Sequence, residues 1–128
     1  MTKQEIRQIV YNKYNGKCAY CGSELPAKWH IDHIEPAVRN SKYDSKNLRY
    51  VADGTCRGQG SDVLSNYNPA CPSCNIQKNS FTIEQFRQNI MGFLNSLNQY
   101  STQYKFAKRY GLIRELETDV IFYFEKQL

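Results

Sequence analysis

Asp32 and His33 are adjacent in the sequence and lie in a short stretch, residues 29–34, in which side chains of different character alternate. Such alternation is typical of a β-strand, and the β-branched residues Ile31 and Ile34 around the pair favour an extended backbone. The strand would present a carboxylate and an imidazole side by side near its end. Together these groups could hold a divalent cation through the aspartate while the histidine activates a water molecule.

Two Cys-x-x-Cys pairs flank this stretch, with Cys18 and Cys21 before it and Cys71 and Cys74 after it. Cysteines paired in this way belong either to a disulfide framework or to a tetrahedral zinc site. Residues 1–8 are polar and charged, so no secretory signal supports the disulfide alternative. In a reducing cytosol we therefore expect the four thiolates to bind one structural zinc ion.

The chain has 128 residues, the size of one ordinary domain. We expect a single domain over residues 1–128, with a motif core at about 16–80 and supporting elements at 81–128. The longest apolar run, residues 120–124, is too short to cross a membrane, so we expect a cytoplasmic protein with no membrane partner.

Basic residues exceed acidic ones, with 17 Lys and Arg against 12 Asp and Glu. Residues 1–109 carry 15 basic and 8 acidic residues, whereas residues 110–128 carry 2 and 4, so a nucleic-acid-binding face would lie in the first part. An excess of this size would also be explained by solubility alone.

Apolar residues recur at helical spacing in three segments, which we expect to be helices: residues 3–14, 82–97 and 102–110. Pro72 suits the first position of a further helix that reaches Lys78. The run at residues 120–124 predicts a strand that is either buried on both faces or paired at an edge.

Residues 35–65 form a long polar stretch, which we expect to be a loop. A loop of this length in a small domain is usually functional, and its cations are candidates for phosphate contacts: Arg39, Lys42, Lys46, Arg49 and Arg57. A solvated loop without a partner is the alternative. Cys56 also lies here without a partner at ligand spacing, and we expect it to be a free thiol in the loop.

The order of these motifs resembles the zinc-containing HNH endonucleases of the ββα-metal, or His-Me finger, group. The resemblance covers about residues 16–78 and rests on Cys-x-x-Cys, Asp-His-Ile-x-Pro, Asn66 and Cys-x-x-Cys-Asn-x-x-Lys. It implies an α+β fold with a ββα-metal motif clamped by the zinc site. The segments described above would add flanking helices and a C-terminal strand. Two features depart from the family pattern: Asn75 stands where many members have His, and the loop after His33 lacks a compact glycine pair.

The resemblance also implies roles for individual residues in the hydrolysis of DNA phosphodiester bonds to 5′-phosphate and 3′-hydroxyl ends. His33 matches the general base. Asp32 and Asn75 match the oxygen ligands of one Mg²⁺ or Mn²⁺ ion. Asn66 matches a residue that buttresses the loop.

Two further residues could contact the substrate. Lys78 is placed to hold a phosphate, unless it is only a solvated lysine. His30, on the Asp32 face of the strand, could join the cation or the phosphate, although a buried, hydrogen-bonded histidine is the more common arrangement. Three alternative functions stay open: a non-catalytic zinc-ribbon module that binds nucleic acid, the same site acting on RNA, and a nuclease that works only within a larger complex. A dimer is possible.

Overall fold

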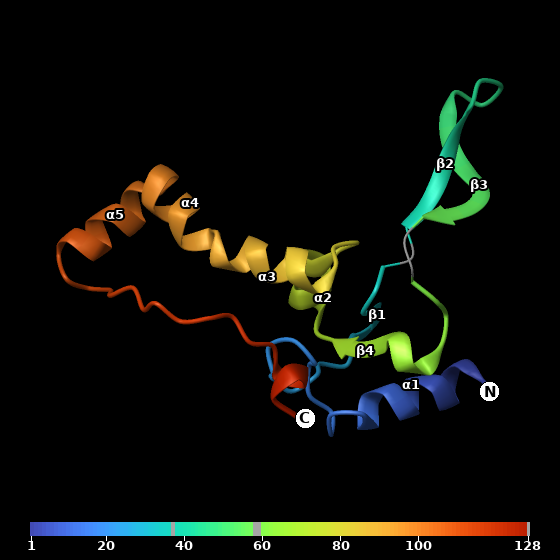
Figure 1. Cartoon of the computed structure of the whole chain (residues 1–128), viewed down its shortest axis with the longest axis horizontal. Helices are drawn as coiled ribbons and strands as arrows, with labels where there is room; N and C mark the ends of the chain where they lie inside the picture. The colour runs from blue at the N-terminus through green and yellow to red at the C-terminus, as the bar shows by residue number, and fades with distance from the viewer. Residues whose placement is uncertain (37, 58–59, 128) are drawn as a thin grey trace.

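The computed structural model describes residues 1–36, 38–57 and 60–127; of residues 38–39 and 54–57 it describes the backbone alone. Figure 1 shows a central body from which two arms project, a β-hairpin on one side and a pair of helices on the other. The elements are α1 (Lys3–Asn12), β1 (His30–His33), β2 (Val38–Asp44), β3 (Arg49–Arg57), β4 (Tyr67–Ala70), α2 (Pro72–Lys78), α3 (Ile83–Met91), α4 (Phe93–Tyr100) and α5 (Thr102–Arg109). Turns of 3₁₀-helix span Leu64–Asn66 and Tyr123–Gln127.

Strands β1 and β4 form the small antiparallel sheet at the centre of the body. Asp32 lies opposite Asn68, and His33 lies opposite Tyr67. β4 runs directly into α2, which has Cys71 as its N-cap and Pro72 at its first position. Since α2 contacts both strands, these elements form a ββα unit. The expected α+β class with a ββα-metal type of arrangement is therefore confirmed.

The expected helices are present with altered ends. α1 ends at Asn12 rather than at Tyr14. The predicted helix over residues 82–97 is divided at Gly92, which ends α3 and begins α4, because glycine is a poor residue for a helix interior. Within the described ranges, no helix is long and apolar enough to cross a membrane.

The expected loop at residues 35–65 is wrong for its central part, where β2 and β3 pair as an antiparallel hairpin. Asp44 closes the turn, because its carboxylate accepts hydrogen bonds from the backbone N–H of Lys46 at 3.0 Å and the side-chain amide of Asn47 at 2.7 Å. Leu48 completes the turn with a φ of 52°. The backbone of Cys56 accordingly belongs to β3 and not to a loop, while its thiol lies outside the described part.

The expected C-terminal strand at residues 120–124 is also wrong, because the sheets of the described chain contain only β1 to β4. The segment instead lies along the first cysteine pair, where Tyr123 N–H donates to the Tyr20 carbonyl at 3.0 Å. Phe122 is buried, stacks on Phe86 with ring centroids 5.0 Å apart and meets the Tyr20 ring edge-on at 5.6 Å. The apolar run therefore marks a core contact and not a strand.

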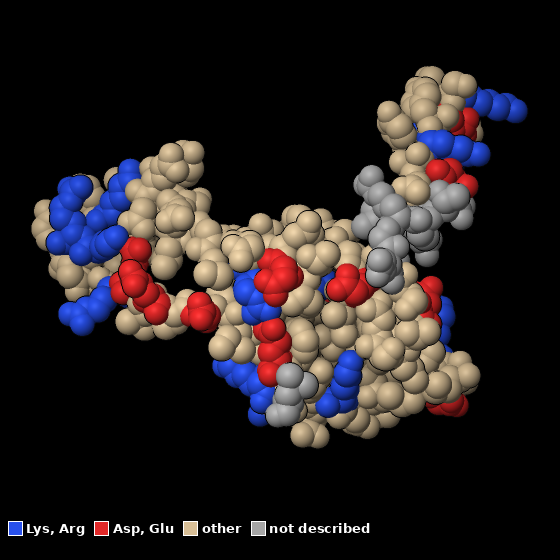
Figure 2. Space-filling view, viewed as in Figure 1, with Lys and Arg blue, Asp and Glu red and all other residues tan. Residues whose placement is uncertain are grey.

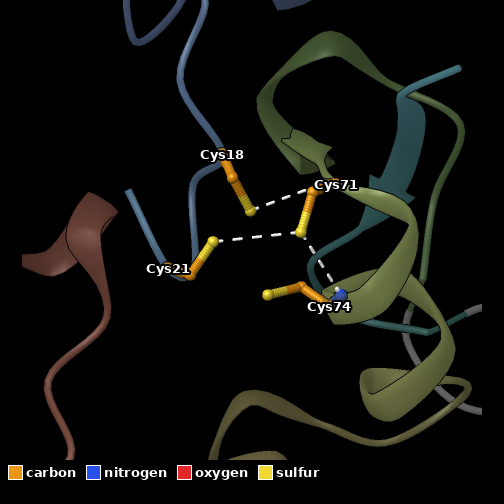
Figure 3. A group of neighbouring side chains, drawn as sticks. All are labelled: Cys18, Cys21, Cys71 and Cys74. Atoms are coloured by element: carbon orange, nitrogen blue, oxygen red, sulfur yellow. Dashed lines mark hydrogen bonds between the residues drawn. The ribbon is translucent and has the colours of Figure 1, made fainter. Parts of the chain in front are cut away.

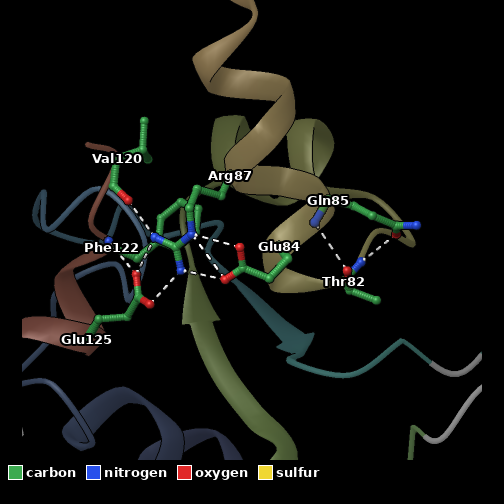
Figure 4. Close-up of polar contacts among 7 residues, drawn as sticks. All are labelled: Thr82, Glu84, Gln85, Arg87, Val120, Phe122 and Glu125. Carbon is green, nitrogen blue, oxygen red and sulfur yellow. Dashed lines mark hydrogen bonds and ion pairs between the residues drawn. The ribbon is translucent and has the colours of Figure 1, made fainter. Parts of the chain in front are cut away.

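Arg87 of α3 fastens this C-terminal segment to the body (Figure 4). Its guanidinium donates to both carboxylate oxygens of Glu125, at 2.9 and 2.6 Å, and to the backbone carbonyl of Val120. The hydrogen bonds from Arg87 lower the pKa of Glu125 below its ordinary value. The bidentate pair thus stabilises the docked segment at neutral pH.

Replacing Glu125 with Gln should lower the free energy of unfolding by about 1 kcal/mol at pH 7, since the pair is only partly exposed. A carboxylate whose folded pKa lies below 4.5 stabilises the fold above that pH and stops doing so as the pH falls through the folded value. The difference in the free energy of unfolding between the parent and Glu125→Gln should therefore become smaller below pH 4.5. Urea unfolding at pH 7 and at pH 4 measures it, with Glu117→Gln, at an exposed site, as the control.

Candidate active site and metal centre

The four predicted zinc ligands meet at one place. The sulfurs of Cys18, Cys21, Cys71 and Cys74 all lie within 4.8 Å of one another (Figure 3). Tetrahedral zinc with Zn–S bonds of about 2.3 Å needs sulfurs roughly 3.8 Å apart, and the Cys21 and Cys71 sulfurs are separated by 3.8 Å. The donor set fits a zinc ion and could hold one.

The charge on one sulfur of this cluster affects the pKa of its neighbours. A hydrogen bond from the Cys74 thiol, opposed by burial, lowers the pKa of Cys18 to about 4. That same hydrogen bond, together with burial, raises the pKa of Cys74. A thiolate at one cysteine therefore disfavours deprotonation of the neighbouring thiols, because like charges repel. A bound dication would allow all four cysteines to be thiolates.

Local structure fixes both cysteine pairs. Gly22, just after the first pair, has a φ of 75°, and a Cβ atom there would lie 2.9 Å from the Tyr123 ring. The Cys71 sulfur caps α2 by accepting the backbone N–H of Cys74 at 3.5 Å. The pair that starts α2 is thereby tied to the helix that carries Asn75.

His33 ends β1 with its ring held from two sides. Its Nε2 lies 2.7 Å from Oδ1 of Asp62, a residue in the connection between β3 and β4. Its ring also meets the ring of Tyr67 edge-on, with centroids 5.2 Å apart. About a third of the His33 side chain is exposed, so the imidazole is both oriented and open to water.

A cleft of about 320 Å³ adjoins this histidine. Its lining residues come from α1 and from the β1–β4 sheet: Lys3, Ile6, Arg7, Ile31, His33 and Tyr67. Arg7 also stacks over the Trp29 ring, with its guanidinium carbon 4.0 Å from the ring centre. Helix α1 therefore gives the histidine a positively charged wall, which suits a phosphate.

Asp32 points to the other side of β1, into the body. The side chain is only 6 % exposed, and its Oδ2 accepts a hydrogen bond from the Tyr20 hydroxyl at 2.5 Å and lies 3.0 Å from Nζ of Lys78. Burial, and then the charge of Asp32, raise the pKa of Tyr20, so the phenol keeps its proton and donates it. Asp32 is thus a buried carboxylate with a buried counter-charge.

This geometry corrects the expectation that Lys78 holds a phosphate. The Lys78 side chain is 0 % exposed, and its ammonium group donates to the His33 carbonyl at 2.7 Å besides pairing with Asp32. A lysine in this position cannot reach a nucleic acid. It links α2 to the end of β1 instead.

Asn66 and Asn75, the two asparagines matched by the resemblance, lie in neighbouring segments, Asn66 in the 3₁₀ turn before β4 and Asn75 in α2. The Asn66 amide donates to the carbonyls of Glu35 and Ser61, at 3.1 and 3.0 Å, and accepts from the Glu35 N–H at 2.9 Å. These contacts join the two chain segments that leave the site. Asn75 is half-buried on α2, and the described contacts do not connect its side chain with Asp32.

The remaining candidates for nucleic-acid contacts are spread over the surface. His30 is exposed at the start of β1, and Lys42 is exposed on β2. The side chains of Arg39 and Arg57 lie outside the described part of the chain.

Sequence analysis missed several groups that meet at the site: Tyr20, Asp62, Lys3 and Arg7. Tyr20 stands between the first two cysteines, a position that could have placed it against the strand that the zinc site holds. Asp62 gave no signal, because it lies 29 residues after His33 in a polar stretch.

The fold and the cysteine centre together define an α+β protein of the ββα-metal type. Residues 18–51 match the family model described as HNH endonuclease, which confirms the resemblance to that family. The match includes the first cysteine pair, β1, β2 and the start of β3, and ends before Asp62 and Asn66. The comparisons with curated proteins and with solved structures found no match.

Proposed function

We propose that this protein is a metal-dependent endonuclease that hydrolyses DNA phosphodiester bonds, with His33 as the general base and a structural zinc ion on the four cysteines. The observation that carries the proposal is the pair of His33 and Asp62, 2.7 Å apart, beside a cleft lined by Lys3 and Arg7. A base that is oriented by a carboxylate and faces a cationic cleft is suited to attack on a phosphodiester.

The Asp62 contact favours Nδ1 of His33 as the nitrogen that acts as the base. A carboxylate accepts hydrogen bonds, so Nε2 carries the proton and Nδ1 keeps its lone pair. Nδ1 then takes a proton from the attacking water, and Asp62 stabilises the imidazolium that forms. Attack at phosphorus with departure of the 3′ oxygen leaves 5′-phosphate and 3′-hydroxyl ends.

Asp32 and Asn75 are the proposed ligands of the divalent cation. Their carboxylate and amide oxygens are of the type that Mg²⁺ and Mn²⁺ prefer. Lys78 and Tyr20 hold Oδ2 of Asp32, so Oδ1 is the oxygen left for the ion. When bound, the cation would neutralise charge on the phosphate and on the leaving oxygen.

The same ion pair favours a second candidate, a non-catalytic zinc module that binds nucleic acid. Lys78 already compensates the charge of Asp32, so this carboxylate does not need a divalent cation for its stability. The proposed nuclease could also act on RNA or within a larger complex, since the proposed roles involve the phosphate and do not read the 2′-hydroxyl of the sugar.

End-labelled DNA duplex and RNA of the same sequence, incubated with zinc-loaded protein in Mg²⁺, Mn²⁺ or EDTA, test the proposal. The expected result is cleavage of DNA in either metal, none in EDTA, and fragments that a ligase can rejoin because they carry 5′-phosphates. Binding of the duplex without cleavage in either metal would support the non-catalytic module. Faster cleavage of the RNA would identify RNA as the substrate.

Replacing Asp62 with Asn should lower kcat about fivefold and leave the affinity for DNA the same or stronger. An exposed pair contributes up to about 1 kcal/mol, and removing a negative charge cannot weaken binding to a polyanion. Single-turnover cleavage and DNA affinity, measured side by side, separate the two effects. Asp62→Glu should recover part of the rate, whereas Asp119→Asn, at an exposed site in the C-terminal segment, should change neither quantity. An unchanged rate in Asp62→Asn would remove Asp62 from the mechanism.

A further inference from the structure

The β2–β3 hairpin begins and ends at the catalytic histidine. β2 starts five residues after His33, and β3 ends five residues before Asp62. The Asn66 amide holds the two chain segments together at this base by bonding to Glu35 and Ser61. Figure 1 shows the hairpin projecting from the end of the body where β1 lies, so a substrate at His33 would lie close to the base of this arm.

The two faces of the hairpin differ in chemistry. Neighbouring residues in a strand point to opposite faces, so Lys42 and Arg49 lie on one face and Tyr43 and Tyr50 on the other. The two tyrosine rings meet with centroids 5.2 Å apart and are 53 % and 73 % exposed. Asp44 lies opposite Arg49 on the cationic face, and its carboxylate is hydrogen-bonded within the turn, so the turn end of this face carries one acidic residue beside Lys42 and Arg49.

Three cations of this arm are exposed and belong to its described side chains: Lys42, Lys46 and Arg49. No hydrogen bond or ion pair among the described residues engages the side chains of Lys42, Lys46 or Arg49, all of which are exposed. Residues 38–57 carry five basic and two acidic residues, so they supply +3 of the net charge of +5. Figure 2 shows Lys and Arg side chains projecting from this arm. The hairpin is therefore complementary to a polyanion.

A hairpin of this kind is poorly stabilised by itself. Two strands with both faces exposed are marginal in water, and the hairpin makes few contacts with the body. The chain exposes 9602 Å², whereas a compact monomer of 15.0 kDa exposes roughly 7,000 Å². The hairpin arm is one of the two projections that depart from a compact shape, and a polyanionic partner would cover its charged face.

We propose that the β2–β3 hairpin is a duplex-binding arm that enters the major groove next to the scissile phosphate. The inference rests on the proposed function and specifies that the substrate is double-stranded. A two-stranded ribbon fits a major groove about 12 Å wide, and a strand of seven residues spans roughly 23 Å, longer than the groove is deep. Lys42 and Arg49 contact phosphates at the groove edge, and the tip at Lys46 and Asn47 meets the base edges.

Duplex binding in EDTA tests this arm independently of cleavage. Fluorescence anisotropy measures the affinity of the parent and of the double variant Lys42→Ala/Arg49→Ala. The ligands are a labelled 30-base-pair duplex and one of its single strands, each at a series of KCl concentrations. The control Lys105→Ala/Arg109→Ala removes the same charge from α5, on the other arm. At about 0.1 M salt each lost phosphate contact should weaken duplex binding roughly tenfold and reduce the slope of log K against log salt by about 1.

The expected result is a loss on the duplex much larger for the hairpin variant than for the control, with a small effect on the single strand. Equal losses in both variants, or no loss in the hairpin variant, would overturn the proposal. Dimethyl sulfate methylates guanine N7 in the major groove, and the complex should protect this atom from methylation. If N7 is not protected and a minor-groove ligand displaces the protein, the arm binds the minor groove and the proposal is wrong. A parent that binds through the hairpin without cutting would refute the nuclease proposal alone.

Discussion

A Cys71→Ser variant is expected to bind no zinc and to show no cooperative unfolding transition at 25 °C. Structural zinc contributes about 10–16 kcal/mol of apparent binding free energy, which equals or exceeds the whole stability of a typical domain. Serine is itself a favourable N-cap, so the start of α2 keeps its capping group and the loss is due to the metal ligand. Zinc content by mass spectrometry and unfolding by circular dichroism measure the result.

The fifth cysteine provides the control for this prediction. Cys56→Ser should keep one zinc ion per chain and the melting temperature of the parent. Chelation of zinc from the parent should reproduce the Cys71→Ser result, and added zinc should reverse it. A Cys71→Ser protein that melts like the parent would show that the hydrophobic core alone maintains the fold.

Replacing Lys78 with Met should lower the free energy of unfolding of the zinc-loaded protein by about 3–5 kcal/mol. The substitution keeps the apolar stem but leaves the buried carboxylate of Asp32 without its counter-charge, and breaking a buried pair in this way is costly. It also removes the donor to the His33 carbonyl, which fixes the end of β1. Urea unfolding at pH 7 gives the change directly.

Lys126→Met is the matched control, because Lys126 is exposed near the C-terminus. It should change stability by less than about 0.5 kcal/mol. Adding Asp32→Asn to Lys78→Met should recover part of the loss, since a neutral amide costs less to bury than an unpaired carboxylate. If Lys78→Met behaves like Lys126→Met, the ammonium group is solvated and its contact with Asp32 is not maintained in solution.

The parts of the fold predicted best from sequence were those with a fixed chemical spacing. The two Cys-x-x-Cys pairs predicted a cluster that the structure brings together, and Pro72 predicted the start of α2. Strict alternation around Asp32 and His33 identified β1. In each case a few neighbouring residues determine the local geometry, so sequence alone was sufficient.

The errors have a common physical cause, which is that the deciding contacts are distant in the sequence. The run at residues 120–124 has the composition of a strand but is held by Phe86 of α3 and by Tyr20. The sequence of the hairpin predicts a loop because neither face is buried by the body, so its residues show no alternation of apolar and polar side chains. Lys78 was assigned to the surface because helical spacing alone cannot show that a helix is covered by β1.

At the site, sequence named the histidine and the aspartate but not the groups around them. Two of these groups contact β1: Asp62 contacts the imidazole of His33, and Lys78 pairs with the carboxylate of Asp32. Adjacent residues of one strand thus enter different environments: His33 faces the cleft, and Asp32 is mostly buried with its Oδ2 held by Lys78 and Tyr20. In the proposed mechanism, this separation leaves His33 open to water while Lys78 holds Asp32 in its charged form.

The measurement that tests the account most directly is the rate at which zinc-loaded parent and His33→Ala nick supercoiled plasmid, with Mg²⁺, Mn²⁺ or EDTA. Both proteins should have the same zinc content, melting temperature and DNA affinity, because His33 is partly exposed and contributes no charge to the core. The parent should nick the plasmid in either metal and not in EDTA. His33→Ala should be slower by about 10²- to 10⁴-fold, the usual contribution of a general base. Nicking by His33→Ala at the rate of the parent would contradict the assignment of the base, and with it the proposed mechanism.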